Sequence, residues 1–195
     1  PFFNFMIEKT GLTWKTLKEK GGHTFPDVFK KYEKNGFSTP SKKVEFANSK
    51  MKKLGVDPLP VHREPSESPI STPELAKEYP LIITTGGRLS MYRHSEGRNI
   101  AILRELMPHP LMSINPATAK GLGIHDGDEV VVETPRGSME AWANLTEGIH
   151  PGVIQLPSHW SGMNNVNLVM DNERCAPLIG STQLRCQLCR VKRKK

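Results

Sequence analysis

Closely spaced prolines divide this 195-residue chain into parts with different sequence patterns. Proline fixes φ and has no backbone N–H, so a regular helix or strand cannot run through a segment in which it recurs every few residues. The prolines of this segment are Pro58, Pro60, Pro65, Pro69, Pro73 and Pro80. We therefore expect residues 56–80 to form an extended strap or linker, with an arm at residues 1–55 before it and a domain at residues 81–195 after it.

The arm has the pattern of short helices and loops. Thr13 is suited to cap a helix over residues 14–20, which Gly21 and Gly22 would end. The alternation at residues 44–46 predicts a short strand. An arm and a strap need a larger surface to lie on, and the chain begins with proline instead of methionine, so we expect it to be a fragment of a longer protein.

Residues 81–195 consist of short apolar runs separated by turn residues. The runs predict strands at residues 81–85, 111–114, 129–133, 138–143 and 153–156. Apolar spacing predicts a helix over residues 99–107, and Asn115-Pro116 is a typical start of a second helix, which Gly121 or Gly123 would end. Short strands, tight turns and short helices favour a mainly β (α+β) fold, a small barrel with flanking helices, over a parallel βαβ sheet.

The chain carries a formal net charge of +7, most of it in the lysines of the arm and in the basic tail at residues 190–195. Charge runs of this kind are typical of solvated faces and chain ends, and a positive field also suits an anionic ligand. Interleaved aromatic residues, a helix-turn-helix or a zinc-finger pattern would indicate nucleic-acid binding, and the sequence has none of them. It also has no apolar run of about 18 residues, so we expect no direct membrane insertion.

The cysteines do not form a metal-binding or disulfide pattern. Cys186 and Cys189 make a single C-x-x-C, and Cys175 stands apart from it. Structural zinc and iron–sulfur clusters take four ligands, and His159 as a fourth zinc ligand is less favoured than ordinary strand positions for the cysteines. We therefore expect no metal ligand in this chain.

Five segments of the domain, in their order along the chain, resemble one known family. They are LIITTGGR (81–88), INPATAKGLGIHDGDEVVVETPRG (114–137), IHPGVIQLPSHW (149–160), MNNVNLVMDN (163–172) and PLIGSTQLRCQLCRV (177–191). The chain resembles the C-terminal molybdopterin guanine dinucleotide-binding domain of the dimethyl sulfoxide reductase family. GFSTPSKKVEF (36–46) and LGVDPLP (54–60) resemble the preceding segment in the thiosulfate/polysulfide reductase-like branch. The resemblance implies a six-stranded double-psi β-barrel preceded by a helical and extended arm.

The resemblance also implies what the parent protein does. It would be an oxidoreductase of the kind used in anaerobic respiration, with bis-molybdopterin guanine dinucleotide and molybdenum or tungsten acting on a small sulfur, oxyanion or formate-like substrate. An iron–sulfur cluster belongs to the upstream part of such a protein. The expected partners are the upstream domains of the same polypeptide and, as a candidate, an electron-transfer iron–sulfur subunit. We expect no catalytic residue in this chain, and the compartment, prokaryotic cytoplasm or periplasm, stays open.

The candidate cofactor contacts are glycines, arginines, amides and a histidine, because a pyrophosphate, a guanine and a pterin need N–H donors, positive charge and paired donors and acceptors. They are Gly86, Gly87, Arg88, Arg93, His94, Ser95, Arg98, Asn99, Asn165, Asn167, Gln183 and Arg185. Each also has a plainer interpretation, as a turn after a strand, a polar helix cap, turn-forming asparagines or outward residues on a last strand.

Two alternatives frame these expectations. The carboxylates Asp126 and Asp128 are explained better by a turn that reverses the chain into a strand than by a metal or acid–base site. For the whole chain, the alternative is a stand-alone double-psi barrel that serves as a binding module for a protein or nucleic-acid partner. The strap and the arm argue against a free module, because it would not need them.

Overall fold

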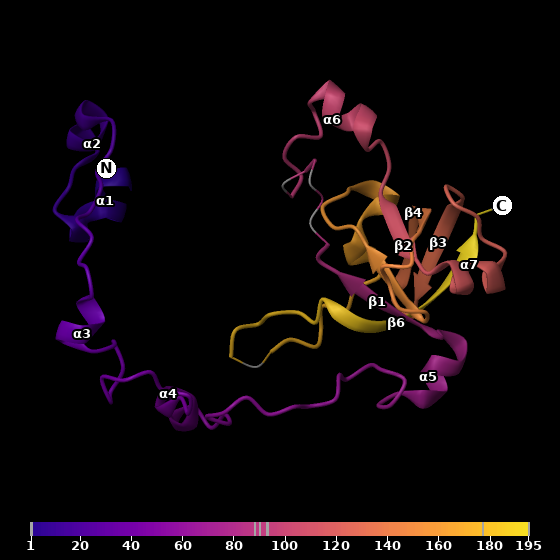
Figure 1. Ribbon diagram of the computed structural model, residues 1–195, viewed down its shortest axis with the longest axis horizontal. Helices are drawn as coiled ribbons and strands as arrows, with labels where there is room; N and C mark the ends of the chain where they lie inside the picture. The colour runs from indigo at the N-terminus through magenta and orange to yellow at the C-terminus, as the bar shows by residue number, and fades with distance from the viewer. Residues whose placement is uncertain (1, 88, 90, 93, 177, 195) are drawn as a thin grey trace. The chain divides into compact units, whose positions relative to one another are not determined.

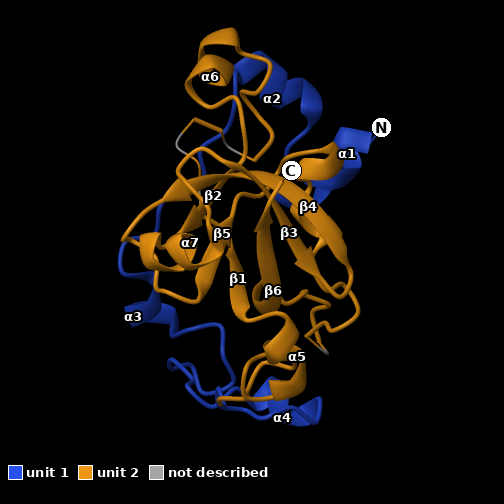
Figure 2. Cartoon of the chain, turned by 90° about the vertical axis from the view of Figure 1, so that its right-hand side faces the viewer, with its two compact units in different colours: residues 1–61 blue, residues 62–195 orange. Residues whose placement is uncertain are grey.

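The computed structural model describes residues 2–87, 89, 91–92, 94–176 and 178–194. The chain splits into two compact units, residues 1–61 and residues 62–195 (Figure 2). The boundary between them lies inside the proline-rich segment, so the second half of that segment belongs to the same unit as the barrel. Among the described residues, no helix has the length and apolar character needed to cross a membrane.

The first unit is a series of short helices joined by irregular segments. They are α1 (Phe2–Ile7), the 3-10 turn η1 (Glu8–Thr10), α2 (Trp14–Lys20), α3 (Lys31–Asn35) and α4 (Ser49–Lys53). The predicted helix over residues 14–20 is confirmed: Thr13 caps it in a reciprocal capping box with Thr16, and Gly21 ends it at φ 70°. None of the residues described in this unit is buried.

The predicted strand at residues 44–46 is wrong. This segment is irregular, and the Glu45 carboxylate turns back to accept the backbone N–H of Ser41 at 2.9 Å. A short alternating run forms a strand only beside a second strand, and no described strand lies in residues 2–61.

The second unit is a closed barrel of six strands with three short helices (Figure 1). Its elements are α5 (Pro73–Glu78), β1 (Leu81–Thr85), α6 (Ala101–Leu106), β2 (Leu111–Ile114), α7 (Pro116–Leu122), β3 (Glu129–Thr134), β4 (Gly137–Leu145), β5 (Val153–Leu156), the 3-10 turns η2 (Gly162–Asn164) and η3 (Val166–Leu168), and β6 (Arg185–Arg193). Around the barrel the strands follow the order β1-β5-β2-β4-β3-β6. The predicted six-stranded, mainly β barrel with flanking helices is confirmed.

One segment inside the predicted strap is regular. Pro73 stands in the first turn of α5, where a missing N–H leaves no hydrogen bond unmade, so this proline begins a helix instead of preventing one. The predicted caps of α7 are confirmed. Asn115 accepts the N–H of Ala117 at 2.9 Å, and of the two glycines considered, Gly123 ends the helix at φ 65°.

The directions of the strands place the two longest connections at the same end of the barrel. The β1–β5 and β2–β4 pairs are parallel, and the other four pairs are antiparallel. The strands β1, β3 and β5 therefore end where β2, β4 and β6 begin. Three connections leave from that end: residues 86–110 with α6, residues 135–136, and residues 157–184 with η2 and η3. We call it the loop end; α5, α7 and residues 146–152 lie at the opposite end.

The core fills the barrel interior. Burial alternates along β1, β3 and β4, as expected for strands with one face inward. The fully buried apolar side chains of this core include Ile83, Met112, Ile114, Val130, Val132, Met139, Ile154, Leu156 and Val169. This packed interior leaves the loop end as the place where polar groups from different strands can meet.

The pairing of β1 with β6 contains a β-bulge at Cys186. Ile83 pairs with Gln187 and Thr84 with Arg185, so Cys186 is the extra residue, and its φ is 66°. A non-glycine residue in the left-handed region is strained, and the bulge that uses this conformation usually has glycine there.

We expect Cys186→Gly to raise the free energy of unfolding by about 1 kcal/mol, because glycine adopts a positive φ without steric strain. Urea denaturation of the two proteins measures the difference. The control is Cys175→Gly, at an exposed position whose φ is not positive, where glycine should bring no gain. A loss of stability in Cys186→Gly would show that the thiol packs well enough to outweigh the strain.

Candidate functional site

The loop end brings together two candidate residues that lie about a hundred positions apart in the sequence. Gly86 directly follows β1 at φ 94°, and Arg185 opens β6 opposite Thr84. A Cβ atom built at Gly86 would lie 3.8 Å from Nη2 of Arg185. At Gly87 a Cβ atom would lie 1.5 Å from the side-chain nitrogen of Gln155, on β5. The absence of side chains at both glycines thus leaves room for the polar groups of β5 and β6.

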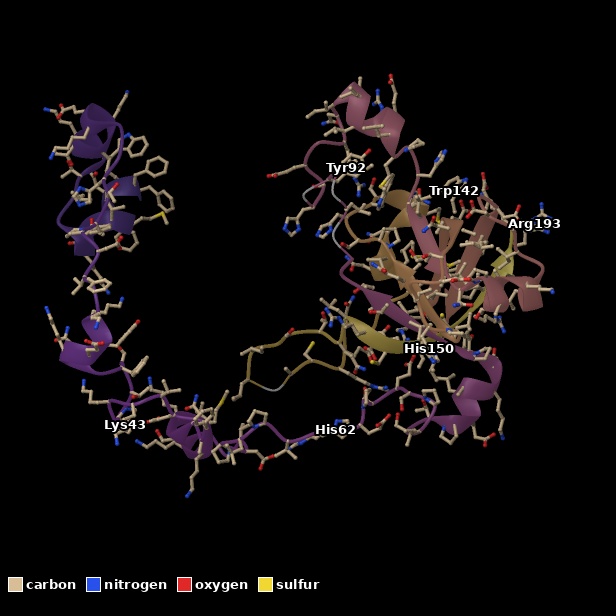
Figure 3. The ribbon with its side chains drawn as sticks, viewed as in Figure 1. Lys43, His62, Tyr92, Trp142, His150 and Arg193 are labelled. Carbon is tan, nitrogen blue, oxygen red and sulfur yellow. The ribbon has the colours of Figure 1, made fainter. Side chains whose placement is uncertain are left out.

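The guanidinium of Arg98 lies in an aromatic corner. Its central carbon is 4.0 Å from the ring centroid of Trp160 and 5.6 Å from that of Tyr92, and the two rings meet edge to face at 6.0 Å. Figure 3 shows Tyr92 in the loop between β1 and α6. Because the guanidinium is partly removed from water, burial lowers the pKa of Arg98.

Three buried donors in this corner have no acceptor among the described residues. They are Nε and Nη2 of Arg98 and Nε1 of Trp160. Buried N–H groups are nearly always hydrogen-bonded, and an unmade bond to a charged donor is unfavourable by a few kcal/mol. The acceptor that such donors lack is an anionic or carbonyl oxygen.

Two histidines are joined next to Arg98. Nδ1 of His94 lies 2.7 Å from Nε2 of His159, and Nδ1 of His159 lies 2.5 Å from Oγ of Ser158. In this contact one ring nitrogen donates its N–H and the other accepts it. Both histidines have positive φ, 58° and 71°. Strain of this kind in two non-glycine residues that face one another is characteristic of functional sites.

The pH dependence of stability should report on this pair. Burial, His94 and the charge of Arg98 lower the pKa of His159. The unfolded chain therefore binds the proton first as the pH falls, and stability decreases with falling pH below about 6.5, the ordinary histidine value. We expect this decrease in urea denaturation between about pH 7 and pH 5, and its loss in His159→Asn. In His150→Asn, at the opposite end of the barrel (Figure 3), the decrease should persist.

Gln183 and Arg185 lie beside the segment that precedes the barrel. Oε1 of Gln183 accepts a hydrogen bond from Oγ of Ser66 at 3.2 Å, and its backbone oxygen accepts one from Nε2 of Gln187 at 2.8 Å. A groove there is lined by Arg63, Pro65, Thr182, Gln183, Leu184, Arg185 and Cys186. The structure thus places both late candidates in one groove.

Asn165 and Asn167 flank the start of η3. Oδ1 of Asn165 accepts the N–H of Asn167 at 3.0 Å, which is turn chemistry, and Asn167 is exposed. The turn is held against β4, where a Cβ atom at Gly137 would lie 2.7 Å from the backbone oxygen of Leu168. Among the described residues, no hydrogen bond joins these asparagines to the Arg98 corner. They belong to the loop end, as a separate part of it.

The remaining candidates are less informative. Ser95 and Asn99 are exposed, and α6 begins beyond Asn99, with Ile100 at its N-cap and no side-chain cap. The predicted helix over residues 99–107 is therefore shorter at both ends. Arg88 and Arg93 lie outside the described residues.

The structure supports the turn interpretation of the two aspartates. Asp126 accepts the N–H of Leu145 at 2.8 Å, and Asp128 accepts that of His125 at 2.9 Å. In the part of the chain that the structure describes, no group of three or more histidine, cysteine, aspartate or glutamate side chains could hold a metal ion.

Sequence reasoning missed the partners that surround Arg98. Tyr92, Ser158 and Trp160 were not among the candidates, and His159 was considered only as a zinc ligand. The signal was the polar and aromatic Ser-His-Trp that follows the strand at residues 153–156 after a single proline. Its meaning depends on β5 running parallel to β1, which brings residues 158–160 beside residues 86–98, and periodicity does not reveal that pairing.

Comparisons with known proteins identify the family of this chain. The family model of the molydopterin dinucleotide binding domain matches residues 81–186. Acetylene hydratase of Syntrophotalea acetylenica is 39% identical over 156 residues, 79% of this chain and 21% of the relative. Dimethyl sulfoxide reductase DmsA of Escherichia coli is 30% identical over 161 residues, 77% of this chain and 19% of the relative. The solved structure of acetylene hydratase from Pelobacter acetylenicus matches with a TM-score of 0.78 and 31% identity, over 99% of this chain and 29% of that one. The chain thus spans less than a third of each of these proteins.

Proposed function

This chain belongs to the family of molydopterin dinucleotide binding domains, and we propose that its loop end grips the guanine dinucleotide part of that cofactor. The resemblance to the dimethyl sulfoxide reductase family is confirmed, and the barrel is the family's double-psi β-barrel. The residues that we propose as contacts are Gly86, Gly87, Arg88, Arg93, His94, Ser95, Arg98, Asn99, Asn165, Asn167, Gln183 and Arg185. Of these, Arg88 and Arg93 lie outside the described residues.

The observation that carries this proposal is the set of unpaired buried donors at Arg98 and Trp160. A phosphate or carbonyl oxygen of a dinucleotide is the acceptor that such donors lack. Arg98 cannot lose its proton at physiological pH, so it presents a permanent positive charge there. The histidine pair beside it can accept or donate a hydrogen bond, which suits the mixed donor and acceptor edge of a pterin.

We propose that the cofactor is bis-molybdopterin guanine dinucleotide carrying molybdenum or tungsten. When bound, its metal centre would supply the redox chemistry. The residues of this chain have other tasks: Arg98 and Arg185 place positive charge, the glycines admit the ligand to the backbone, and Trp160 and Tyr92 keep water from the guanidinium. Upstream domains of the same polypeptide would supply the opposite wall, the metal ligand and an iron–sulfur cluster, and an electron-transfer iron–sulfur subunit is the proposed partner.

The substrate of the parent protein is not determined by the residues that bind the cofactor. The relatives carry names as different as acetylene hydratase and dimethyl sulfoxide reductase, although each contains a segment similar to this chain. This difference supports the proposal that the shared segment holds the cofactor and that the substrate pocket is formed by other parts of the parent protein. We propose a small sulfur compound, oxyanion or formate-like molecule as the substrate, handled by electron or oxygen-atom transfer.

A titration with GDP, followed by amide NMR of the isotope-labelled chain, tests the grip. GDP carries the guanine, ribose and diphosphate of the cofactor without the pterin. We expect saturable shifts at Gly86–Asn99, Asn165–Asn167 and Gln183–Arg185. ADP is the control ligand, since it has the same diphosphate with a different base edge, and it should bind more weakly. A folded spectrum without shifts at millimolar GDP would contradict the proposed dinucleotide grip.

A further inference from the structure

A buried carboxylate ties the segment before the barrel to the loop end. Only 4% of the Glu67 side chain is exposed. Arg136, in the β3–β4 turn, donates from Nη1 to Oε2 at 2.8 Å and from Nη2 to Oε1 at 2.9 Å. The backbone N–H of Leu188 on β6 donates to Oε1 at 2.8 Å. A carboxylate is stable in such a place only when it is paired and fully hydrogen-bonded, as Glu67 is.

Glu67 supplies a hydrogen-bond acceptor that a neighbouring strand would otherwise supply to β6. The pairing of β3 with β6 stops at Glu133 and Arg190, because β3 ends at Thr134. Two residues before Arg190 along β6, the N–H of Leu188 has no β3 partner and donates to Glu67 instead. The opening stretch of β6 is therefore held by a side chain from the segment before the barrel.

The hydrogen-bond network of Glu67 and Arg136 continues to Gln187, a residue that is only 1% exposed. Oε1 of Gln187 accepts from Nη2 of Arg136 at 3.4 Å and from the N–H of Asp171 at 2.9 Å. Nε2 donates to the backbone oxygen of Gln183 at 2.8 Å. One amide thus fixes both ends of residues 171–183, and Arg136 fixes the orientation of that amide.

Ser66, next to Glu67, touches the same segment twice. Its hydroxyl donates to Oε1 of Gln183, and its backbone oxygen accepts from Nη1 of Arg174, both at 3.2 Å. Ser66 and Glu67 therefore contact Arg174, near the start of the segment that leads into β6, and Gln183 and Leu188, near its end.

We propose that Glu67 is a positioning residue for the cofactor grip: through Arg136, Gln187 and Leu188 it holds residues 171–188 so that Gln183 and Arg185 face the ligand. The inference rests on the proposed function, in which these two side chains contact the dinucleotide. It assigns to the segment before the barrel a task in cofactor binding, although no side chain of that segment needs to touch the cofactor.

The test is Glu67→Gln in the full-length enzyme that contains this chain. Glutamine keeps the size of the side chain but loses its charge and its second acceptor oxygen. Hydrogen exchange followed by mass spectrometry should show roughly tenfold faster exchange at the amides of Asp171 and Leu188, which report on the network directly. Exchange in α7 should stay unchanged. The pterin and metal content of the purified enzyme should fall severalfold.

Two further variants separate positioning from general damage. Glu74→Gln changes a glutamate of α5 whose side chain is 83% exposed and paired with Lys77, and it should alter neither exchange nor pterin content. Ser66→Ala removes only the hydroxyl bond to Gln183; it should lower the pterin content while exchange at Leu188 stays normal. This milder variant keeps the inference testable if Glu67→Gln does not accumulate as folded protein.

Unchanged exchange at Asp171 and Leu188 in Glu67→Gln would overturn the inference. Faster exchange with full pterin content would overturn it as well, because the segment would then be loosened without consequence for the cofactor. The GDP titration of the unsubstituted chain reports on the proposed function independently of both outcomes.

Discussion

Replacing Arg98 by methionine is expected to weaken GDP binding about a hundredfold without lowering the stability of the free protein. In the free protein, Nε and Nη2 of Arg98 are buried without an acceptor, so their removal ends an unfavourable desolvation. Methionine has a flexible, unbranched side chain that can fill the space between Trp160 and Tyr92. With ligand bound, two charge-assisted hydrogen bonds would be lost, each contributing about 1.5 kcal/mol or more.

Isothermal titration with GDP and urea denaturation measure the two sides of this prediction. The matched control is Arg104→Met on α6, where the arginine is exposed and both quantities should stay unchanged. Two results would contradict the prediction. Unchanged GDP affinity would remove Arg98 from the site, and a large loss of stability would mean that its stacking on the aromatic rings matters more than its unpaired donors.

The second large effect concerns the buried ion pair. We expect Glu67→Met and Arg136→Met each to lower the free energy of unfolding by about 3–5 kcal/mol, because each leaves a partly or fully buried charge unpaired. The double variant should lose far less than the sum, about 1–2 kcal/mol, since only the N–H of Leu188 then stays without an acceptor. Direct hydrogen bonding to Glu67 raises the pKa of Arg136.

Urea denaturation of the four proteins gives the coupling energy of this pair. The exposed pair of Glu74 and Lys77 on α5, 2.7 Å apart, is the matched control, and its coupling should be a few tenths of a kcal/mol. Additive effects of Glu67→Met and Arg136→Met would mean that the two charges are screened by water and that the pair contributes little.

Local features of the fold were predictable from the sequence because each depends on neighbouring residues. The cap at Thr13, the hairpin around Arg136 and the Asn115 cap all follow from chemistry within a few positions. The strand expected at residues 44–46 is absent because a strand depends on a partner elsewhere in the chain, which the local pattern does not show. The order of the strands around the barrel is also a matter of distant partners, and it came from the family resemblance.

The same division applies to the candidate site. Gly86 could be named from the segment LIITTGGR, and Arg98 from its place in the polar loop between that segment and the predicted helix. Their setting could not, because Trp160 reaches Arg98 only through the parallel pairing of β1 with β5. The role of Glu67 could not be predicted from the sequence, because a glutamate among prolines is typical of a solvated linker. Its burial depends on an arginine of the β3–β4 turn and a backbone amide of β6, which are distant in the sequence.

The strand order has a consequence for how this protein is made. β1 is bordered by β5 and β6, so the first strand of the barrel to be synthesised has no partner until β5 has been made, and it lacks its second partner until β6 has been made. Of the six strand pairs, only β3 with β4 joins strands that follow one another along the chain. Contacts of such long sequence separation make folding slow and leave strand edges open for longer. The loop end is formed by the segments that follow β1 and β5 and by the segment that precedes β6, so this end of the barrel is complete only after residue 193 has been synthesised.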